Sequence, residues 1–276
     1  MSKQKFKHIV LSGGGILSCA HIGFLDVLFE QDLIASSGLE IHGTSAGSIV
    51  GLMFIIGMPP KEMISKVMKW TTSSLLVLSD LHALEENYGM DNGEYLRAIL
   101  MDLLFSRGFS HDETLLSLFE KTQIGLNITV TNINMSKSEV WNYKNKPNTK
   151  VVDAIYASSS IPLLFSPMRT FSDVIYVDGG IRDNYPVPQN VPCHEVVGCE
   201  LVSWKQCDVT SFESYIVSVL SCLMMQQNDV HRSVTTVSID CSDMTYFNFD
   251  ISEEERMMLY KRGYDGALKR LSRAIS

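Results

Sequence analysis

Short apolar segments and longer, periodically apolar segments alternate along the first part of this chain. His8 to Leu11 predicts a short buried strand that ends in a glycine turn. Cys19 to Glu30 carries apolar side chains at spacings typical of a helix packed on a sheet. Leu39 to His42 predicts a second short strand. Ser45 to Ile56 is apolar all round, which indicates a helix buried on every face.

The same alternation continues to the end of the chain. The apolar spacing from Met63 to Met68 marks another helix, after the break at Gly57, Pro59 and Pro60. Further strands are expected within Leu126–Tyr143, which reads as two strands joined by a polar turn, and at Val174–Val177, Glu195–Val202 and Thr235–Asp240. Further helices are expected at Ser252–Ala274 and at Phe212–Met225, the second with Phe212, Ile216, Val219, Leu220 and Leu223 on one face.

Strands that alternate with helices predict an α/β fold, a three-layer α/β/α arrangement with a mostly parallel central sheet. We find no repeat, no low-complexity segment and no linker, so residues 1–276 are expected to form a single domain. Residues 71–122 look helical and looped, without a clear strand. We expect them to cover one side of a site.

Composition narrows the functional classes. The 276 residues are 45% hydrophobic, which suits one domain with a large core. The formal net charge of −8 argues against non-specific nucleic-acid binding, which needs cationic surface. The six cysteines show no zinc or redox spacing, so we expect free thiols in a reducing compartment and no metal.

The chain shows neither a secretory signal nor a membrane span. Its N-terminus has lysines but no long apolar region, and the longest apolar run, Ile49 to Met58, is about half the length of a bilayer span. These features predict a cytoplasmic protein that does not cross a membrane. They leave open contact with a lipid surface.

The first motif with chemical meaning surrounds a serine. In Gly43-Thr44-Ser45-Ala46-Gly47 the glycines leave room for a sharp strand-to-helix turn that would present the Ser45 hydroxyl above the sheet. The N-terminus of the following helix would favour a negative charge at that spot. The alternative is a small residue in a tight turn, because this motif also occurs by chance.

The second motif is the run Gly13-Gly14-Gly15 after the first strand. Consecutive glycines can aim backbone N–H groups at one point, as an oxyanion hole or a phosphate cradle requires, and a plain tight turn is the alternative. A dinucleotide fingerprint would need glycine where this chain has Ser18. The lysine of a nucleotide-binding P-loop is also absent.

The third motif is Asp178-Gly179-Gly180, which follows a predicted strand. An aspartate at the end of a strand lies where open α/β sheets build their sites, although an ordinary Asx turn would have the same sequence. A parallel sheet would bring all three motifs to one edge. A nucleophile, oxyanion donors and a carboxylate would then share one crevice, and these are the parts of an acyl-transfer site.

The combination of motifs resembles the patatin-like phospholipases. The chain contains SGGGILS, GTSAGS and YVDGGIRDNYPV in that family's order. The segments DAIYASSSIPLLFSPM and FNFDISEEERMMLYKRGYDGALKRL are also similar to the family, so the resemblance covers nearly the whole chain.

The resemblance implies a patatin-like fold and a lipid acyl hydrolase that acts on phospholipid or glycerolipid esters without a metal or other cofactor. Contact with a lipid surface is expected, and no protein activator is identified. The residues that it implies are Ser45 as nucleophile, Asp178 as general base, Gly13, Gly14 and Gly15 as the oxyanion hole, and Gly43, Gly47, Gly179 and Gly180 as supporting turns.

One departure from the family keeps a second hypothesis open. The family's glycine turn usually continues with Arg or Lys and then Gly, where this chain has Leu17 and Ser18. The missing cation favours, as the alternative, a catalytically weak or silent lipid-binding protein with the same fold. Arg169 or Arg182 could supply a charge from elsewhere.

The histidines raise the alternative of a Ser-His-Asp triad, with His194 or His231 as the base. We expect both to be surface or structural residues, and His21 and His42 to serve packing around the motifs. The remaining polar residues near the motifs are expected to be structural: Ser158, Ser159 and Ser160 at a helix end or turn, and Asn184 and Tyr185 in the loop after Asp178.

Overall fold

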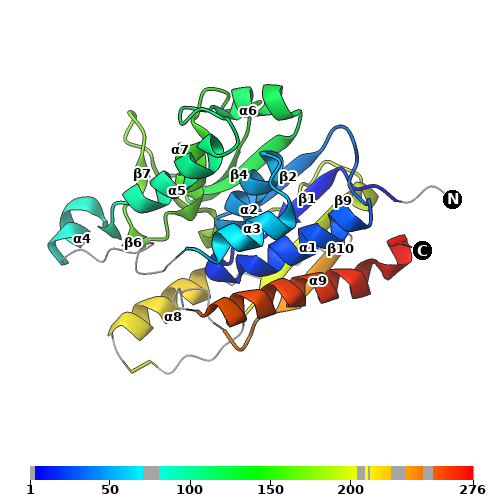
Figure 1. The fold of residues 1–276 in the computed structure, drawn as a ribbon. Coiled ribbons are helices and arrows are strands. Elements are labelled where there is room, and N and C mark those ends of the chain that lie inside the picture. Colours follow the sequence, from blue (N-terminus) through cyan, green and yellow to red (C-terminus); the bar gives the residue numbers. More distant parts are fainter. Residues whose placement is uncertain are drawn as a thin grey trace.

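A mixed, mostly parallel sheet with packed helices forms the body of the protein (Figure 1). The computed structural model describes residues 4–70, 81–203, 209–210, 212–224, 234–244 and 251–275. The fold is of the expected three-layer α/β/α class. That residues 1–276 form one domain stays a prediction.

The strands of the large sheet follow the order β10-β9-β1-β2-β4-β8-β7, and β5 also pairs with β4. These strands are β1 (His8–Leu11), β2 (Glu40–Thr44), β4 (Gly125–Asn132), β5 (Lys137–Trp141), β7 (Met168–Arg169), β8 (Ile175–Asp178), β9 (Val196–Val202) and β10 (Thr235–Asp240). A second, two-stranded sheet pairs β3 (Gly89–Asp91) with β6 (Leu163–Phe165).

The helices are α1 (Cys19–Glu30), α2 (Ala46–Ile55), α3 (Pro60–Val67), α4 (Leu81–Asn87), α5 (Glu94–Phe105), α6 (Leu115–Thr122), α7 (Val151–Ser159), α8 (Phe212–Met224) and α9 (Glu253–Ile275). The bounds of β1 and α1 agree with the sequence pattern. The expectation of no strand in residues 71–122 is wrong in one place, since β3 lies there. Residues 71–80 lie outside the described residues.

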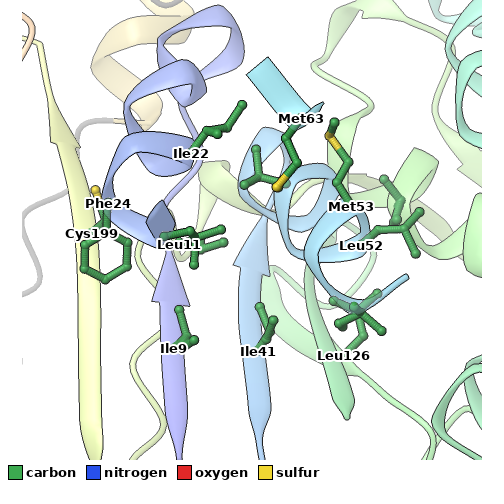
Figure 2. Packing of buried hydrophobic residues seen from close by; sticks show 14 of the residues in the cluster. Ile9, Leu11, Ile22, Phe24, Ile41, Leu52, Met53, Met63, Leu126 and Cys199 are labelled. Atoms are coloured by element: carbon green, nitrogen blue, oxygen red, sulfur yellow. The ribbon is translucent and has the colours of Figure 1, made fainter. Parts of the chain in front are cut away.

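The main core lies between the sheet and the helices that pack on it. Figure 2 shows Ile9, Leu11 and Ile41 of the sheet beneath side chains of α1 and α2. Strand side chains alternate between the two faces, so Val10 points the other way and joins a smaller cluster with Tyr185. The prediction that α2 is apolar and buried on every face agrees with the structure, in which the residues of α2 are buried except for Ile49 and Phe54, which are half-buried.

Helix α9 closes the sheet edge at β10. The Arg270 side chain donates to the Thr236 carbonyl oxygen at 3.1 Å, and the Arg262 side chain donates to the Asp240 carbonyl oxygen at 3.3 Å. Eight residues of helix and four residues of strand span similar lengths, about 12 and 13 Å. The two arginines therefore match the spacing of the carbonyl groups along β10. Within the described residues, no helix has the length and apolar character of a membrane span.

Helices α1 and α9 cross in close contact. A Cβ added at Gly23 of α1 would lie 2.0 Å from the Tyr260 carbonyl oxygen, and one at Gly263 of α9 would lie 1.9 Å from the Ala20 carbonyl oxygen. Tyr260 also donates a hydrogen bond to Asp26, which is buried in α1. Glycine at the crossing is what allows the two backbones to come this close.

Replacement of Gly23 by alanine should therefore force the two helices apart. We expect Gly23→Ala to lower the free energy of unfolding by about 1–3 kcal/mol, as overpacking does, despite alanine's better helix propensity. Chemical denaturation measures the change. Lys261→Ala, an exposed position on α9, is the control and should have little effect. An unchanged stability of Gly23→Ala would contradict this view of the crossing.

Candidate active site

Ser45 occupies a strained turn between β2 and α2. Its backbone has φ 53° and ψ −125°, a conformation that non-glycine residues rarely adopt. A Cβ at Gly43 would lie 2.6 Å from the Ser48 nitrogen, and one at Gly47 would lie 2.4 Å from the Leu11 carbonyl oxygen. Only glycine fits at these two positions, so the sequence permits the sharp turn that the GTSAGS motif predicted.

A second serine fixes this turn. The backbone N–H of Ser45 donates to Ser158 Oγ at 2.8 Å, and Ser158 Oγ donates in turn to the Thr129 carbonyl oxygen at 2.6 Å. Ser158 is fully buried near the end of α7. Its hydroxyl therefore ties the serine turn to the central strand β4. As expected from the sequence, Ser158 is structural, but its contact with Ser45 was not foreseen.

Asp178 reaches Ser45 by a route that the sequence reasoning did not anticipate. We expected three parallel strands to end at one edge, but β8 is antiparallel to β4. Strand β5 pairs with one side of β4. Strands β2 and β8 both pair with the opposite side of β4, β2 with its first part and β8 with its last part. Thr44 ends β2 opposite Thr129, and Asp178 ends β8 opposite Val130. The two strands thus meet end to end, which brings the motifs together.

The Asp178 carboxyl group is fully buried, and burial raises its pKa from 3.8 to about 7. Oδ1 accepts a hydrogen bond from the Gly180 N–H at 2.7 Å. Oδ2 is buried without a hydrogen bond of standard length among the described residues. The nearby Ser45 hydroxyl and the Gly180 N–H both favour the charged carboxylate, and so lower this raised pKa in part. The group is therefore poised to exchange a proton near neutral pH.

The glycine turn contributes two unused backbone N–H groups near Ser45. The Gly13 N–H donates to the Asn184 carbonyl oxygen at 3.0 Å, so it is already engaged. The N–H groups of Gly14 and Gly15 make no hydrogen bond among the described residues. A Cβ at Gly13 would lie 3.5 Å from the Ser45 Cβ and 2.3 Å from Asn184 Oδ1, which shows how closely these segments approach.

A narrow apolar pocket of about 90 Å³ opens beside Ser45. Helix α5 forms part of its wall, and α2, α3, the glycine turn and the chain after α7 contribute the other parts. That residues 71–122 as a whole cover the site stays a prediction. Ser159 also lies on the wall, and its hydroxyl is buried without a hydrogen-bond partner among the described residues. The apolar side chains of the wall include Ile49, Met53, Val67, Leu96, Ile161 and Phe165.

The described histidines lie in positions that argue against a triad. His194 comes just before β9, and Val196 pairs with His8 at the start of β1, so His194 lies at the opposite edge of the sheet from Ser45. Burial lowers the pKa of His21 to about 4 and that of His42 to about 3, so both are neutral. His21 is fully buried, and His42 is half-buried beside the His8 ring. His231 lies outside the described residues.

The structure shows where the two residues that depart from the family's glycine turn lie. Leu17 is fully buried in the main core, and Ser18 lies on the wall of the pocket. The guanidinium of Arg169 stacks on the ring of Tyr88 at 4.5 Å, and Arg182 is exposed on the loop after Asp178. Within the described residues, no group of His, Cys, Asp and Glu side chains is arranged to hold a metal ion.

The three adjacent serines at the end of α7 should respond differently to alanine. We expect Ser158→Ala to cost about 2–3 kcal/mol, because it leaves two buried backbone groups without partners. Ser160→Ala should cost about 1 kcal/mol, since it loses one bond, to the Tyr156 carbonyl oxygen. Ser159→Ala should be near neutral, because no bond is lost. Equal losses in urea denaturation of all three variants would contradict this assignment.

The raised pKa of Asp178 should also appear in the stability of the fold. The neutral carboxyl is favoured in the folded state, so its contribution is fully present below about pH 4 and is lost as the pH rises through 7. We expect Asp178→Asn, which stays neutral, to exceed the wild type by about 2–4 kcal/mol at pH 8 and to match it near pH 4. Denaturation of both proteins across this range measures the difference. Parallel pH profiles would refute the shift.

Known proteins resemble this chain in sequence. One relative, "Probable lipid hydrolase 463L" of Invertebrate iridescent virus 6, is 24% identical over 95% of this chain and 91% of its own length. Triacylglycerol lipase 4 of Saccharomyces cerevisiae is 26% identical over 65% of this chain. This chain spans only 22% of that yeast protein.

Solved structures share the fold. VipD of Legionella pneumophila superposes with a TM-score of 0.70 at 18% identity, over 98% of this chain and 67% of that one. ExoU of Pseudomonas aeruginosa, in complex with SpcU, gives a TM-score of 0.58 at 17% identity, over 100% of this chain and 54% of that one. The family model of patatin-like phospholipase matches residues 9–191, which include every motif at Ser45 and Asp178. The chain therefore belongs to the patatin-like phospholipase family.

Proposed function

We propose that this protein hydrolyses fatty-acyl esters of phospholipids or glycerolipids with a Ser45–Asp178 dyad. The observation that carries the proposal is the strained turn that holds Ser45 beside the buried carboxyl group of Asp178. A serine hydroxyl is a weak nucleophile until a base is ready to take its proton. A carboxylate with a pKa of about 7 is such a base near neutral pH.

In the first half of the proposed reaction, Ser45 Oγ attacks the ester carbonyl carbon while Asp178 accepts the hydroxyl proton. The N–H groups of Gly14 and Gly15 are suited to receive the oxyanion, because Gly13 is engaged by Asn184. The first N–H of α2, at Ala46, is a further candidate, since helix N-termini carry unpaired donors. Collapse of the tetrahedral intermediate transfers the proton to the leaving alcohol or lysolipid and leaves an acyl-serine.

In the second half, water enters and Asp178 takes its proton as the oxygen attacks the acyl-serine. The second tetrahedral intermediate uses the same N–H donors. Its collapse returns the proton to Ser45 Oγ and releases the fatty acid. One carboxyl group thus serves both halves, which is why the proposal needs neither a histidine nor a metal.

The pocket beside Ser45 supports an acyl substrate. Its wall is apolar at Ile49, Met53 and Leu96, so an alkyl chain could lie there with the ester carbonyl at Ser45. The names of the relatives, a lipid hydrolase and a triacylglycerol lipase, point to the same class of substrate. We therefore propose glycerolipid and phospholipid esters as substrates, with the head group left to experiment.

Fatty-acid release from mixed phospholipid vesicles and from a triacylglycerol emulsion tests the proposal. We expect Ser45→Ala and Asp178→Asn each to lower kcat/KM by about a thousandfold or more, because each removes an essential part of the dyad. Ser65→Ala, an exposed serine on α3, is the matched control and should keep full activity. Retained turnover in Ser45→Ala, with a folded protein, would refute the proposal.

The pH profile is a separate test of the base. Because Asp178 must be deprotonated to accept the serine proton, kcat/KM should rise about tenfold per pH unit below 7 and level off above it. A dissolved short-chain ester avoids effects of pH on a lipid surface. A profile that is flat from about pH 5 to 8 would exclude Asp178 as a base with this pKa.

A catalytically silent lipid-binding protein remains the second candidate. Leu17 in the core, where the family's turn usually carries a cation, and the engaged Gly13 N–H are the observations that favour it. Vesicle binding by wild type without any fatty-acid release, under conditions where a known lipase is active, would support this candidate and overturn the first.

A further inference from the structure

Helix α8 packs one apolar face against the chain that follows α7. Leu220 is buried and Ile216 is half-buried, and both contact a cluster that contains Ile161, Leu164 and Phe165. Ile161 and Phe165 also lie on the wall of the pocket at Ser45. This face of α8 therefore supports the pocket from outside.

The apolar surface of α8 continues beyond the covered residues onto an exposed flank. Tyr215, Val219 and Leu223 are 52%, 39% and 44% exposed, and Cys222 is exposed as well. Residues four or seven positions apart lie along one side of a helix, so these four side chains form a single stripe, here called the α8 stripe. The sequence pattern places Val219 and Leu223 on one face with Leu220, and the structure buries Leu220 but leaves the other two exposed.

The α8 stripe lies at the catalytic end of the molecule. Figure 1 shows α8 at the end of the molecule opposite both termini, and the cluster beneath it includes residues of β6. Leu163 of β6 is also 38% exposed, next to Leu164 of the cluster beneath α8. The apolar face of α8 is therefore wider than the part that the cluster covers, and its exposed part is available to a further apolar partner.

The charges around α8 indicate what kind of partner this is. The stripe itself carries no Lys, Arg, Asp or Glu, and Glu213 is the one residue of these four types in the sequence of the helix. Arg182 is exposed after the turn that α8 contacts and is followed by Asp183, so this turn carries one charge of each sign. An anionic membrane would be repelled by the net charge of −8, and the described residues of α8 and of the turn that it contacts include no cluster of Lys and Arg.

We propose that the α8 stripe inserts into an electrically neutral lipid surface and holds the pocket mouth against it. The inference rests on the proposed function in one respect: lipid is chosen as the occupant because the supported pocket is suited to an acyl chain. Binding by apolar insertion would be insensitive to salt, unlike binding through Lys and Arg.

Flotation with phosphatidylcholine vesicles tests this inference. In the Ser45→Ala background, which leaves the lipid intact, we expect the double variant Val219→Glu with Leu223→Glu to bind about tenfold less or weaker still, because two inserted side chains are lost. Phe29→Glu is the matched control and should bind normally. Phe29 is 61% exposed near the end of α1 that lies away from the glycine turn.

In the active protein, the double variant should lose hydrolysis of vesicle lipid to a similar degree and keep hydrolysis of a dissolved short-chain ester. Unchanged melting temperature shows that the fold is intact, and Leu223→Ser alone is a milder variant if it is not. A Ser45→Ala protein that binds through α8, beside a wild type that releases no fatty acid, would refute only the proposed function.

Three outcomes would overturn the inference about α8. Equal binding of the double variant and the control would exclude the stripe as the docking surface. Stronger binding to phosphatidylglycerol vesicles that salt abolishes would indicate a charged site instead. A dimer that the double variant disrupts, without any vesicle binding, would show that the stripe joins two copies of the chain.

Discussion

The end-to-end meeting of β2 and β8 along one side of β4 is the constraint on which the candidate site depends. Thr44 and Asp178 lie opposite adjacent residues of β4, Thr129 and Val130. The two strands run toward each other and both end here, so the serine turn and the carboxylate share one level of the sheet. Backbone hydrogen bonds, rather than flexible side chains, therefore set the distance between the two motifs. The hydroxyl of Ser158 also fixes the serine turn to β4, because it bonds to the Ser45 N–H and to the Thr129 carbonyl oxygen.

This arrangement places a carboxyl group where water does not reach it. Asp178 is fully buried, and the cost of charging it there raises its pKa. The same burial that makes the group a base near neutral pH also weakens the fold once the group is charged. The stability of the fold thus favours the protonated form of Asp178, whereas the proposed catalysis needs the deprotonated form. Such a conflict between stability and activity is typical of functional sites.

The sequence predicts local features of this protein well and tertiary ones less well. The bounds of β1 and α1, the turn at Ser45 and the buried surround of α2 follow from periodicity and glycine spacing. The direction of β8 could not be read, because an isolated strand has the same pattern in either orientation. The roles of Ser158 and the Gly13 N–H depend on partners more than a hundred residues away. The face of α8 that is buried is likewise decided by what packs there, not by its own sequence.

The hydrogen bonds of the α9 arginines to β10 show that the segment with the catalytic motifs is shorter than the segment needed to complete the sheet. Every motif lies within residues 9–191, the range matched by the family model, but β1 pairs with β9, which begins only at Val196. Strand β10 then covers β9, and α9 bonds to the outward carbonyl groups of β10. A fragment cut after the last motif would leave the unpaired side of β1 open to strands of other chains, and self-association into aggregates would follow. The C-terminal third of the chain therefore covers the strand edge of β1 and so prevents edge-to-edge aggregation.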